Sequence, residues 1–254
     1  MALPTRIGRL RLPVLCFVVS TSDARDGDVE RVVGEAIAGG ATMVLLREET
    51  MPAGDLLALA RRVKNVTRGK ALLVIYDRVD VAIALEADGV HLPENGLPVR
   101  TARSLIGKYT VLGRSSDDHA SALDATRDGA EWVLAGPIYK SASQPDEKPT
   151  GAKLLTEIVE NSSIPVIAIG GITMDNVTEV VKAGAAGIAV RSGISGSADP
   201  KGAAEALANA LREAWAERPN EVAVGASEIQ REAVRSTPRH YRCAVDSVRW
   251  PSRG

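Results

Sequence analysis

Three charged residues directly follow the apolar run at 43–46, which places ionic groups at the end of a strand predicted to be buried. Arg47, Glu48 and Glu49 lie there, and a segment with helical spacing begins shortly after them. A guanidinium can hold a phosphate through paired hydrogen bonds, and a carboxylate can accept or give a proton. We therefore take Arg47 and Glu49 as candidate catalytic residues at the rim of an active site.

Two glycine-containing segments later in the chain could hold a phosphate. Gly170 and Gly171 follow one predicted strand, and Arg191, Ser192 and Gly193 follow the next. Glycine leaves backbone N–H groups uncovered, and barrel enzymes often bind phosphate in the loops after their last two strands. Two such loops in the expected places predict a phosphate-binding site. For Arg191 alone, a solvated rim position is the alternative.

Polar residues also end the other predicted strands, where substrate-binding groups are expected. Asp77 is in addition the one candidate metal ligand, and Tyr139 is a candidate catalyst. A packed imidazole is the alternative for His91. The loop 136–151, which carries Lys140, Ser143 and Lys148, is a binding loop or a flexible solvated loop. The predicted substrate-binding residues are Tyr76, Asp77, His91, Ser115, Gly136 and Ser141.

The elements that must position these residues alternate between short aliphatic runs and segments with helical spacing. Fully apolar strands are typical of a parallel sheet covered on both faces. Eight strand–helix units predict one α/β domain, a (β/α)₈ TIM barrel over 14–216. An open doubly wound sheet is disfavoured because no G-x-G-x-x-G follows the first strand. The predicted strands are Val14–Ser20, Thr42–Arg47, Ala71–Tyr76, Gly89–Leu92, Val111–Ser115, Trp132–Ala135, Val166–Ile169 and Gly187–Val190.

The predicted helices fill the intervals between these strands. They are Asp28–Ala38, Ala53–Val66, Val79–Ala87, Val99–Ile106, Ala120–Arg127, Lys153–Asn161, Asp175–Ala183 and Lys201–Trp215. Residues 1–13 are interpreted as an N-terminal extension, because the apolar run at 13–19 is too short for a signal peptide or a membrane span and fits a buried strand. Residues 217–254, with three prolines and no lasting periodicity, are interpreted as an irregular tail.

Composition excludes several classes of function. The net charge of −1 and the aromatic content of 3 % favour neither nucleic acid nor a membrane surface as partner. Cys16 and Cys243 are far apart and form no metal-type spacing, so a reduced, cytoplasmic protein is expected. No lysine falls within a predicted strand, which disfavours a Schiff-base aldolase. A phosphorylated small molecule is the expected ligand, and a homo-oligomer is compatible with the sequence.

Several segments resemble the thiamine phosphate synthase / TenI superfamily. The resemblance runs in order from about residue 14 to 215 and implies a TIM barrel that acts on phosphorylated intermediates of thiamine synthesis. The stretches at 71–103 and 164–200 are its most specific parts. The segments are LLREE, VIYDRVDVAIALEADGVHLPENGLPVRTAR, LGRSSDD, GAEWVLAGPIY, IPVIAIGGIT and AGAAGIAVRSGISGSADP.

Resemblance to the synthase branch implies that an aminopyrimidine-methyl pyrophosphate loses pyrophosphate and is captured by a thiazole phosphate, with Mg²⁺ required. The family pattern Q-x-R-x-K reads here as Leu45, Arg47 and Glu49, and its second metal carboxylate falls on Gly96. The family's lysine is thus replaced by Glu49. For a side-chain charge about 4 Å from a substrate phosphate, and an effective dielectric near 20, this changes roughly 4 kcal/mol of attraction into a similar repulsion. The family's Asn-Asp reads as Tyr76-Asp77, and its Thr/Lys loop as Ser141, Ser143 and Gln144.

Resemblance to the TenI branch implies a thiazole tautomerase, which needs a phosphate grip and a general acid/base but no metal. The family histidine after the sixth strand is replaced here by Gly136-Pro137, which leaves Glu49, Glu94, Tyr139 or His91 to carry the proton. A divergent TenI-like protein is our main interpretation, without a cofactor. The alternatives are a synthase that uses Mg²⁺, with Arg114, Lys140 or Lys148 supplying cations, and a non-catalytic protein that binds a phosphate ligand.

Overall fold

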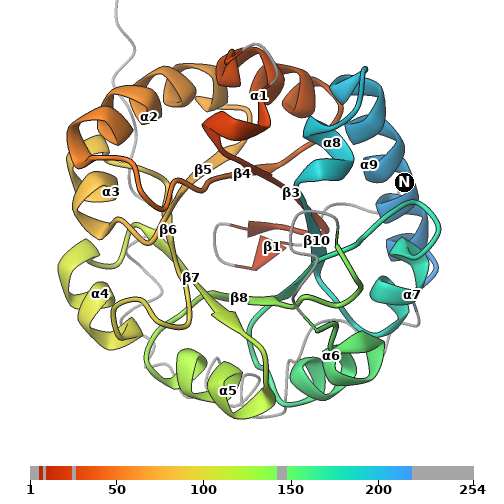
Figure 1. The fold of residues 1–254 in the computed structure, drawn as a ribbon. Coiled ribbons are helices and arrows are strands. Elements are labelled where there is room, and N and C mark those ends of the chain that lie inside the picture. The colour runs from red at the N-terminus through yellow and green to blue at the C-terminus, as the bar shows by residue number, and fades with distance from the viewer. Residues whose placement is uncertain (1–5, 8–9, 25–26, 142–147, 219–254) are drawn as a thin grey trace, which may run out of the picture.

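Eight parallel strands close into a barrel with the helices arranged around it (Figure 1). The computed structural model describes residues 6–7, 10–24, 27–141 and 148–218. Each barrel strand pairs in parallel with its neighbours, and β10 closes the ring against β3. The predicted TIM barrel is confirmed. The strands are β3 (Val14–Val19), β4 (Met43–Leu46), β5 (Leu72–Tyr76), β6 (Gly89–Leu92), β7 (Val111–Ser116), β8 (Trp132–Ala135), β9 (Val166–Ile169) and β10 (Gly187–Val190).

The helices form an outer layer around the barrel, and each helix buries one face against the strands. In α1, the buried residues Val29, Val32, Val33 and Ala36 recur at helical spacing. The Asp28 side chain caps this helix by accepting the Arg31 N–H at 2.9 Å. The helices are α1 (Val29–Ala38), α2 (Ala53–Thr67), α3 (Val79–Leu85), α4 (Val99–Ile106), α5 (His119–Arg127), α6 (Gly151–Glu160), α7 (Val177–Lys182), α8 (Ser192–Ser195) and α9 (Pro200–Ala216).

The strands separate two hydrophobic cores. In β3, Leu15, Phe17 and Val19 belong to the core between strands and helices. The alternate residues of the strand, among them Cys16, belong to a smaller core inside the barrel. Because side chains alternate across a strand and both faces are covered, strands such as β3 and β4 are apolar along their whole length.

A two-stranded hairpin precedes the barrel, made by β1 (Arg6–Ile7) and β2 (Leu10–Arg11). Leu10 and Leu12 are buried in the core inside the barrel, and Figure 1 shows β1 within the ring of strands. Because this segment leads directly into the start of β3, it closes the amino-terminal end of the barrel. The interpretation of 1–13 as an extension did not include this role, because two-residue strands are too short to give a periodic pattern.

Every predicted barrel strand and surrounding helix is present, with ends shifted by a few residues. The helix predicted over 79–87 ends earlier, at Leu85, because Glu86 adopts a left-handed conformation with φ of 54°. Besides the strands of the hairpin, two short elements were not predicted, the 3₁₀ helix η1 (Thr21–Asp23) and α8. Within the described ranges, no helix has both the length and the apolarity needed to cross a membrane. The predicted tail lies outside the described residues from 219 onward.

Candidate active site

The carboxyl ends of the strands carry a ring of polar side chains above the core inside the barrel. Val18 of β3, Leu45 of β4 and Val74 of β5 belong to that core. By the alternation of side chains, the residues two positions later also face the barrel axis. These residues are Ser20, Arg47 and Tyr76, so two of the predicted site residues lie at the mouth of the barrel.

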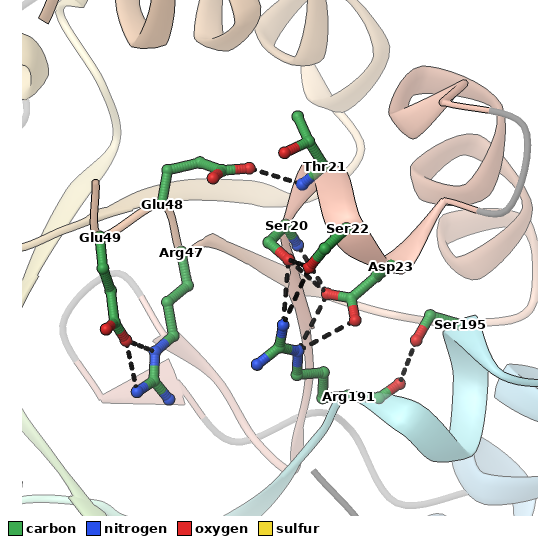
Figure 2. A network of polar contacts seen from close by, with 9 residues as sticks. All are labelled: Ser20, Thr21, Ser22, Asp23, Arg47, Glu48, Glu49, Arg191 and Ser195. Atoms are coloured by element: carbon green, nitrogen blue, oxygen red, sulfur yellow. Dashed lines mark hydrogen bonds and ion pairs between the residues drawn. The ribbon is translucent and has the colours of Figure 1, made fainter. Parts of the chain in front are cut away.

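Arg47 is held between a carboxylate and an aromatic ring. Its Nε donates to Glu49 Oε1 at 2.8 Å, and its terminal nitrogen Nη2 lies 2.7 Å from the same oxygen (Figure 2). The guanidinium carbon lies 4.9 Å from the centre of the Tyr76 ring. This is a cation–π contact, which attracts the guanidinium to the ring face. The structure thus brings together Arg47 and Glu49, two of the three predicted catalytic residues, and Glu49 neutralises the charge expected to receive a phosphate.

His91 is fully buried beneath Tyr76. Its Nε2 lies 2.8 Å from the Ser115 hydroxyl oxygen, and its ring is 4.7 Å from that of Trp132 and 5.9 Å from that of Tyr76. Burial lowers the pKa of His91 to about 3, assisted by the positive charges of Arg47 and Arg114. The imidazole is therefore neutral at physiological pH. Of its two interpretations, the packed imidazole describes its surroundings, and its hydrogen bond orients the Ser115 hydroxyl.

Arg191 joins the ends of β10 and β3. Its Nε donates to both carboxylate oxygens of Asp23, at 3.0 and 2.9 Å, and Nη2 donates to the Ser20 hydroxyl at 3.0 Å (Figure 2). Asp23 Oδ2 also accepts the backbone N–H of Ser20 at 2.8 Å. A third loop reaches the same turn, because the Thr21 N–H donates to Glu48 at 2.5 Å. The guanidinium predicted for phosphate binding is thus engaged by an internal carboxylate.

Ser20 and Asp23 were missed by the sequence analysis. Polar residues were sought at the ends of the later strands, whereas these two follow the first barrel strand and β10 is its neighbour in space. The rule that the carboxyl ends of barrel strands carry the site would have found them if it had been applied to "STSD".

The loops predicted to bind phosphate are packed closely against the loop after β8. Gly171 has φ of 61°, and an added Cβ would overlap the carbonyl oxygen of Lys140. Gly170 has φ of 97°, and its Cβ would lie 2.7 Å from the Cα of Pro137. Close packing and positive φ therefore explain why glycine occupies these two positions, independently of any ligand. Ser192 and Gly193 begin the short helix α8 after Arg191. Phosphate binding by this set stays a prediction.

The loop after β8 places its predicted residues differently. Tyr139 is half-buried and packs against the outer core, beside Glu179 of α7. Burial, and then the Glu179 carboxylate, raises its pKa to about 12, so the phenol keeps its proton. Gly136 (φ of 159°) approaches the Ile169 carbonyl too closely for any side chain. Ser141 is half-buried, whereas Ser143 and Gln144 lie outside the described residues.

Glu94 is a candidate proton carrier whose pKa moves toward neutrality. Burial raises the pKa of Glu94, and the charge of Asp117 in the next loop raises it further. The loop that carries Glu94 is held by Arg114, which donates to the carbonyl oxygens of Glu94 and Leu97 at 2.6 and 3.1 Å. Arg114, a candidate source of positive charge for the substrate, therefore uses its guanidinium to stabilise this loop.

The described residues do not form the two-carboxylate Mg²⁺ site that the resemblance implies. Asp77, with φ of 60°, lines an open cavity of about 660 Å³ together with Asn95 and Gly96. A Cβ added to Gly96 would lie 2.7 Å from Asp77 Oδ1. Residue 96 thus faces Asp77, as the second carboxylate of a pair would, but carries no ligand. Among the described residues, no group of three His, Cys, Asp or Glu side chains is placed to hold a metal.

Comparisons with known proteins agree with this architecture. The family model described as thiamine monophosphate synthase matches residues 15–194. The thiamine-phosphate synthase of Roseiflexus castenholzii is 42 % identical over 69 % of this chain and 78 % of its own length. A putative thiamine-phosphate synthase of Geobacter sulfurreducens is 40 % identical over 76 % of this chain and 92 % of its own length.

A solved structure is similar to this chain in both fold and sequence. Thiamine phosphate pyrophosphorylase from Pyrococcus furiosus superposes with a TM-score of 0.73 at 34 % identity, covering 80 % of this chain and 97 % of its own. These relatives have synthase or pyrophosphorylase names, which favours the synthase alternative over the tautomerase interpretation. The chain belongs to the thiamine monophosphate synthase / TenI superfamily.

Proposed function

We propose that this protein is a transferase of thiamine biosynthesis that joins an aminopyrimidine-methyl pyrophosphate to a thiazole phosphate. The bond between the methylene carbon and the pyrophosphate oxygen breaks, with the electron pair leaving on pyrophosphate. The thiazole nitrogen then forms the new bond to that carbon, giving thiamine phosphate. The Geobacter sulfurreducens relative, named a putative thiamine-phosphate synthase, is 40 % identical to this chain over 92 % of its own length. This similarity supports the synthase reaction over the tautomerase reaction.

The observation that carries the proposal is the Arg47 guanidinium held over the Tyr76 ring at the barrel mouth. Arg47 supplies the positive charge for the leaving pyrophosphate, and charge stabilisation of a leaving group is a large term in such reactions. The Tyr76 ring keeps the guanidinium in place through a cation–π contact. Beneath Tyr76, the neutral His91 shares a hydrogen bond with the Ser115 hydroxyl. The thiazole phosphate is assigned to the loops after β9 and β10.

The test is incubation of the full chain with both substrates and Mg²⁺, followed by chromatographic detection of thiamine phosphate. We expect product that depends on both substrates, and at least a tenfold lower kcat/KM for Arg47→Gln, as for loss of about 1.4 kcal/mol of transition-state stabilisation. Arg127→Gln, an exposed arginine paired with Asp124 at 3.6 Å on α5, is the control. No product at high protein concentration would reject the synthase proposal.

A thiazole tautomerase is the second candidate, and the raised pKa of Glu94 is the observation that favours it. Its test is the aromatisation rate of a thiazole carboxylate phosphate with and without protein. An unchanged rate removes this candidate. Should both assays be negative while thiazole phosphate still binds, the non-catalytic alternative is the function that fits.

A further inference from the structure

Two arginines at the barrel mouth carry internal carboxylates, but the two pairs are built differently. Asp23 uses both carboxylate oxygens toward Arg191 and is held in place by the Ser20 N–H and hydroxyl. The side chains of Arg191 and Asp23 are only 28 % and 14 % exposed. This network spans β3 and β10 and is fixed from several sides, so an incoming anion has little opportunity to replace the carboxylate.

The Arg47–Glu49 pair has the opposite character. One oxygen of Glu49 receives both guanidinium contacts, and the Glu49 side chain is 57 % exposed. Arg47 itself is 23 % exposed and is kept in place from the other side by the Tyr76 ring. The guanidinium can therefore stay where it is while the carboxylate turns out into solvent. Exposed ion pairs contribute little free energy, so exchange of this carboxylate for another anion is inexpensive.

We propose that Glu49 is an internal counter-ion of Arg47 that the diphosphate of the substrate must displace, so that Glu49 sets the affinity of the site for this substrate. The identity of the displacing anion rests on the proposed synthase function. Glu49 acts here through Arg47, as a specificity-determining residue. Its carboxylate occupies the two guanidinium N–H groups that a diphosphate needs, and its charge repels the anion until it has turned away.

The experiment uses the full chain and two readouts. The first is calorimetric titration with inorganic pyrophosphate as the probe. The second is the pair of KM values for the pyrimidine pyrophosphate and the thiazole phosphate. The test variant is Glu49→Gln, which keeps the size and removes the charge. The matched control is Glu48→Gln, which removes an equal charge one residue away, where the side chain contacts the Thr21 N–H and a glutamine oxygen can still accept that bond.

We expect Glu49→Gln to bind pyrophosphate about fivefold more tightly, as for loss of an exposed ion pair. The KM for the pyrimidine substrate should fall by a similar factor, while the KM for the thiazole phosphate stays constant. The inference is overturned if Glu49→Gln leaves the pyrophosphate affinity unchanged or weakens it, or if Glu48→Gln raises it equally. Tighter pyrophosphate binding without any thiamine phosphate would uphold the counter-ion and reject the synthase function, so the two failures are distinct.

Discussion

Arg191 donates a hydrogen bond to each carboxylate oxygen of Asp23, although the two residues are 168 positions apart in the chain. The contact joins the last strand of the barrel to the first, at the end that carries the site (Figure 2). It therefore contributes to closing the ring as well as to fixing the loop after β10.

Replacement of Asp23 by asparagine should lower the free energy of unfolding by about 1–3 kcal/mol, because a mostly buried guanidinium loses its counter-charge. For a chain of this size each kcal/mol corresponds to about 2–4 °C in Tm. Thermal and urea unfolding measure the change. Asp124→Asn, which removes an exposed partner of Arg127, is the control and should alter stability by less than about 0.5 kcal/mol. Equal effects of the two substitutions would contradict a stabilising role for the Asp23 contact.

The buried His91 predicts a pH dependence of stability. Its pKa in the folded state is lowered to about 3, so between its ordinary value of about 6.5 and pH 3 the unfolded chain binds a proton that the folded chain does not. Stability contributed by the neutral ring is thus present above pH 6.5 and is lost as the pH falls, by at most about 1.4 kcal/mol per pH unit. Urea unfolding between pH 7.5 and 4.5 should show a steeper loss for the natural chain than for His91→Gln.

The exposed His119 at the start of α5 gives the control for this measurement. Replacement by glutamine leaves the His91 contribution in place, so the acid-side loss of stability should persist. If His91→Gln retained the full slope as well, the lost stability would have to come from other groups.

Even the smallest side chain at position 171 should destabilise the protein. Gly171→Ala combines φ of 61° with overlap between the new Cβ and the Lys140 carbonyl, so we expect a loss of about 2–4 kcal/mol in the free energy of unfolding. Gly69→Ala is the matched control, because Gly69 has φ of 73° and open space around it. Its loss should stay near 1 kcal/mol. A similar cost at both positions would show that the close approach of the two loops is unimportant.

This result also bears on phosphate binding. A bulky substitution such as Gly171→Asp would abolish binding by displacing the loop after β8, whether or not the glycine contacts the ligand. Binding tests of the β9 and β10 loops therefore need substitutions outside the packed glycines, such as Ser192→Ala.

The missing second carboxylate beside Asp77 can be restored. Gly96→Asp would place a carboxylate next to Asp77, after a small shift of the Asp77 side chain. We expect a lower Tm without Mg²⁺, because like charges repel, and a recovery of Tm on adding Mg²⁺, which binds paired carboxylates. Differential scanning calorimetry with and without Mg²⁺ measures this. Gly96→Asn, which lacks the charge, should show no such recovery; a Tm of Gly96→Asp that ignores Mg²⁺ would show that the two positions do not cooperate.

The barrel could be predicted because its signal is local. A strand such as Val166–Ile169 is apolar along its length, and the following glycines mark where it ends, so its position and type follow from the sequence. Short elements lack such a signal. The two-residue strands of the hairpin and the four-residue α8 contain too few residues to show any period.

The positions of Arg47 and Tyr76 at strand ends could be predicted from the sequence, whereas their pairings could not. That Glu49 turns back onto Arg47, and that Tyr139 turns outward toward Glu179, depends on side-chain rotamers and on neighbours distant in sequence. Neither spacing nor residue type determines such choices.

The hairpin at the start of the chain has a kinetic consequence. Leu10 and Leu12 fill the amino-terminal end of the barrel and the core above them is packed, so the proposed reaction would take place at the opposite end, where the strands end. The two substrates and two products of the proposed reaction would therefore enter and leave through the same opening. If one substrate bound beneath the other, the two would bind in a fixed order, and an excess of the upper substrate would inhibit turnover.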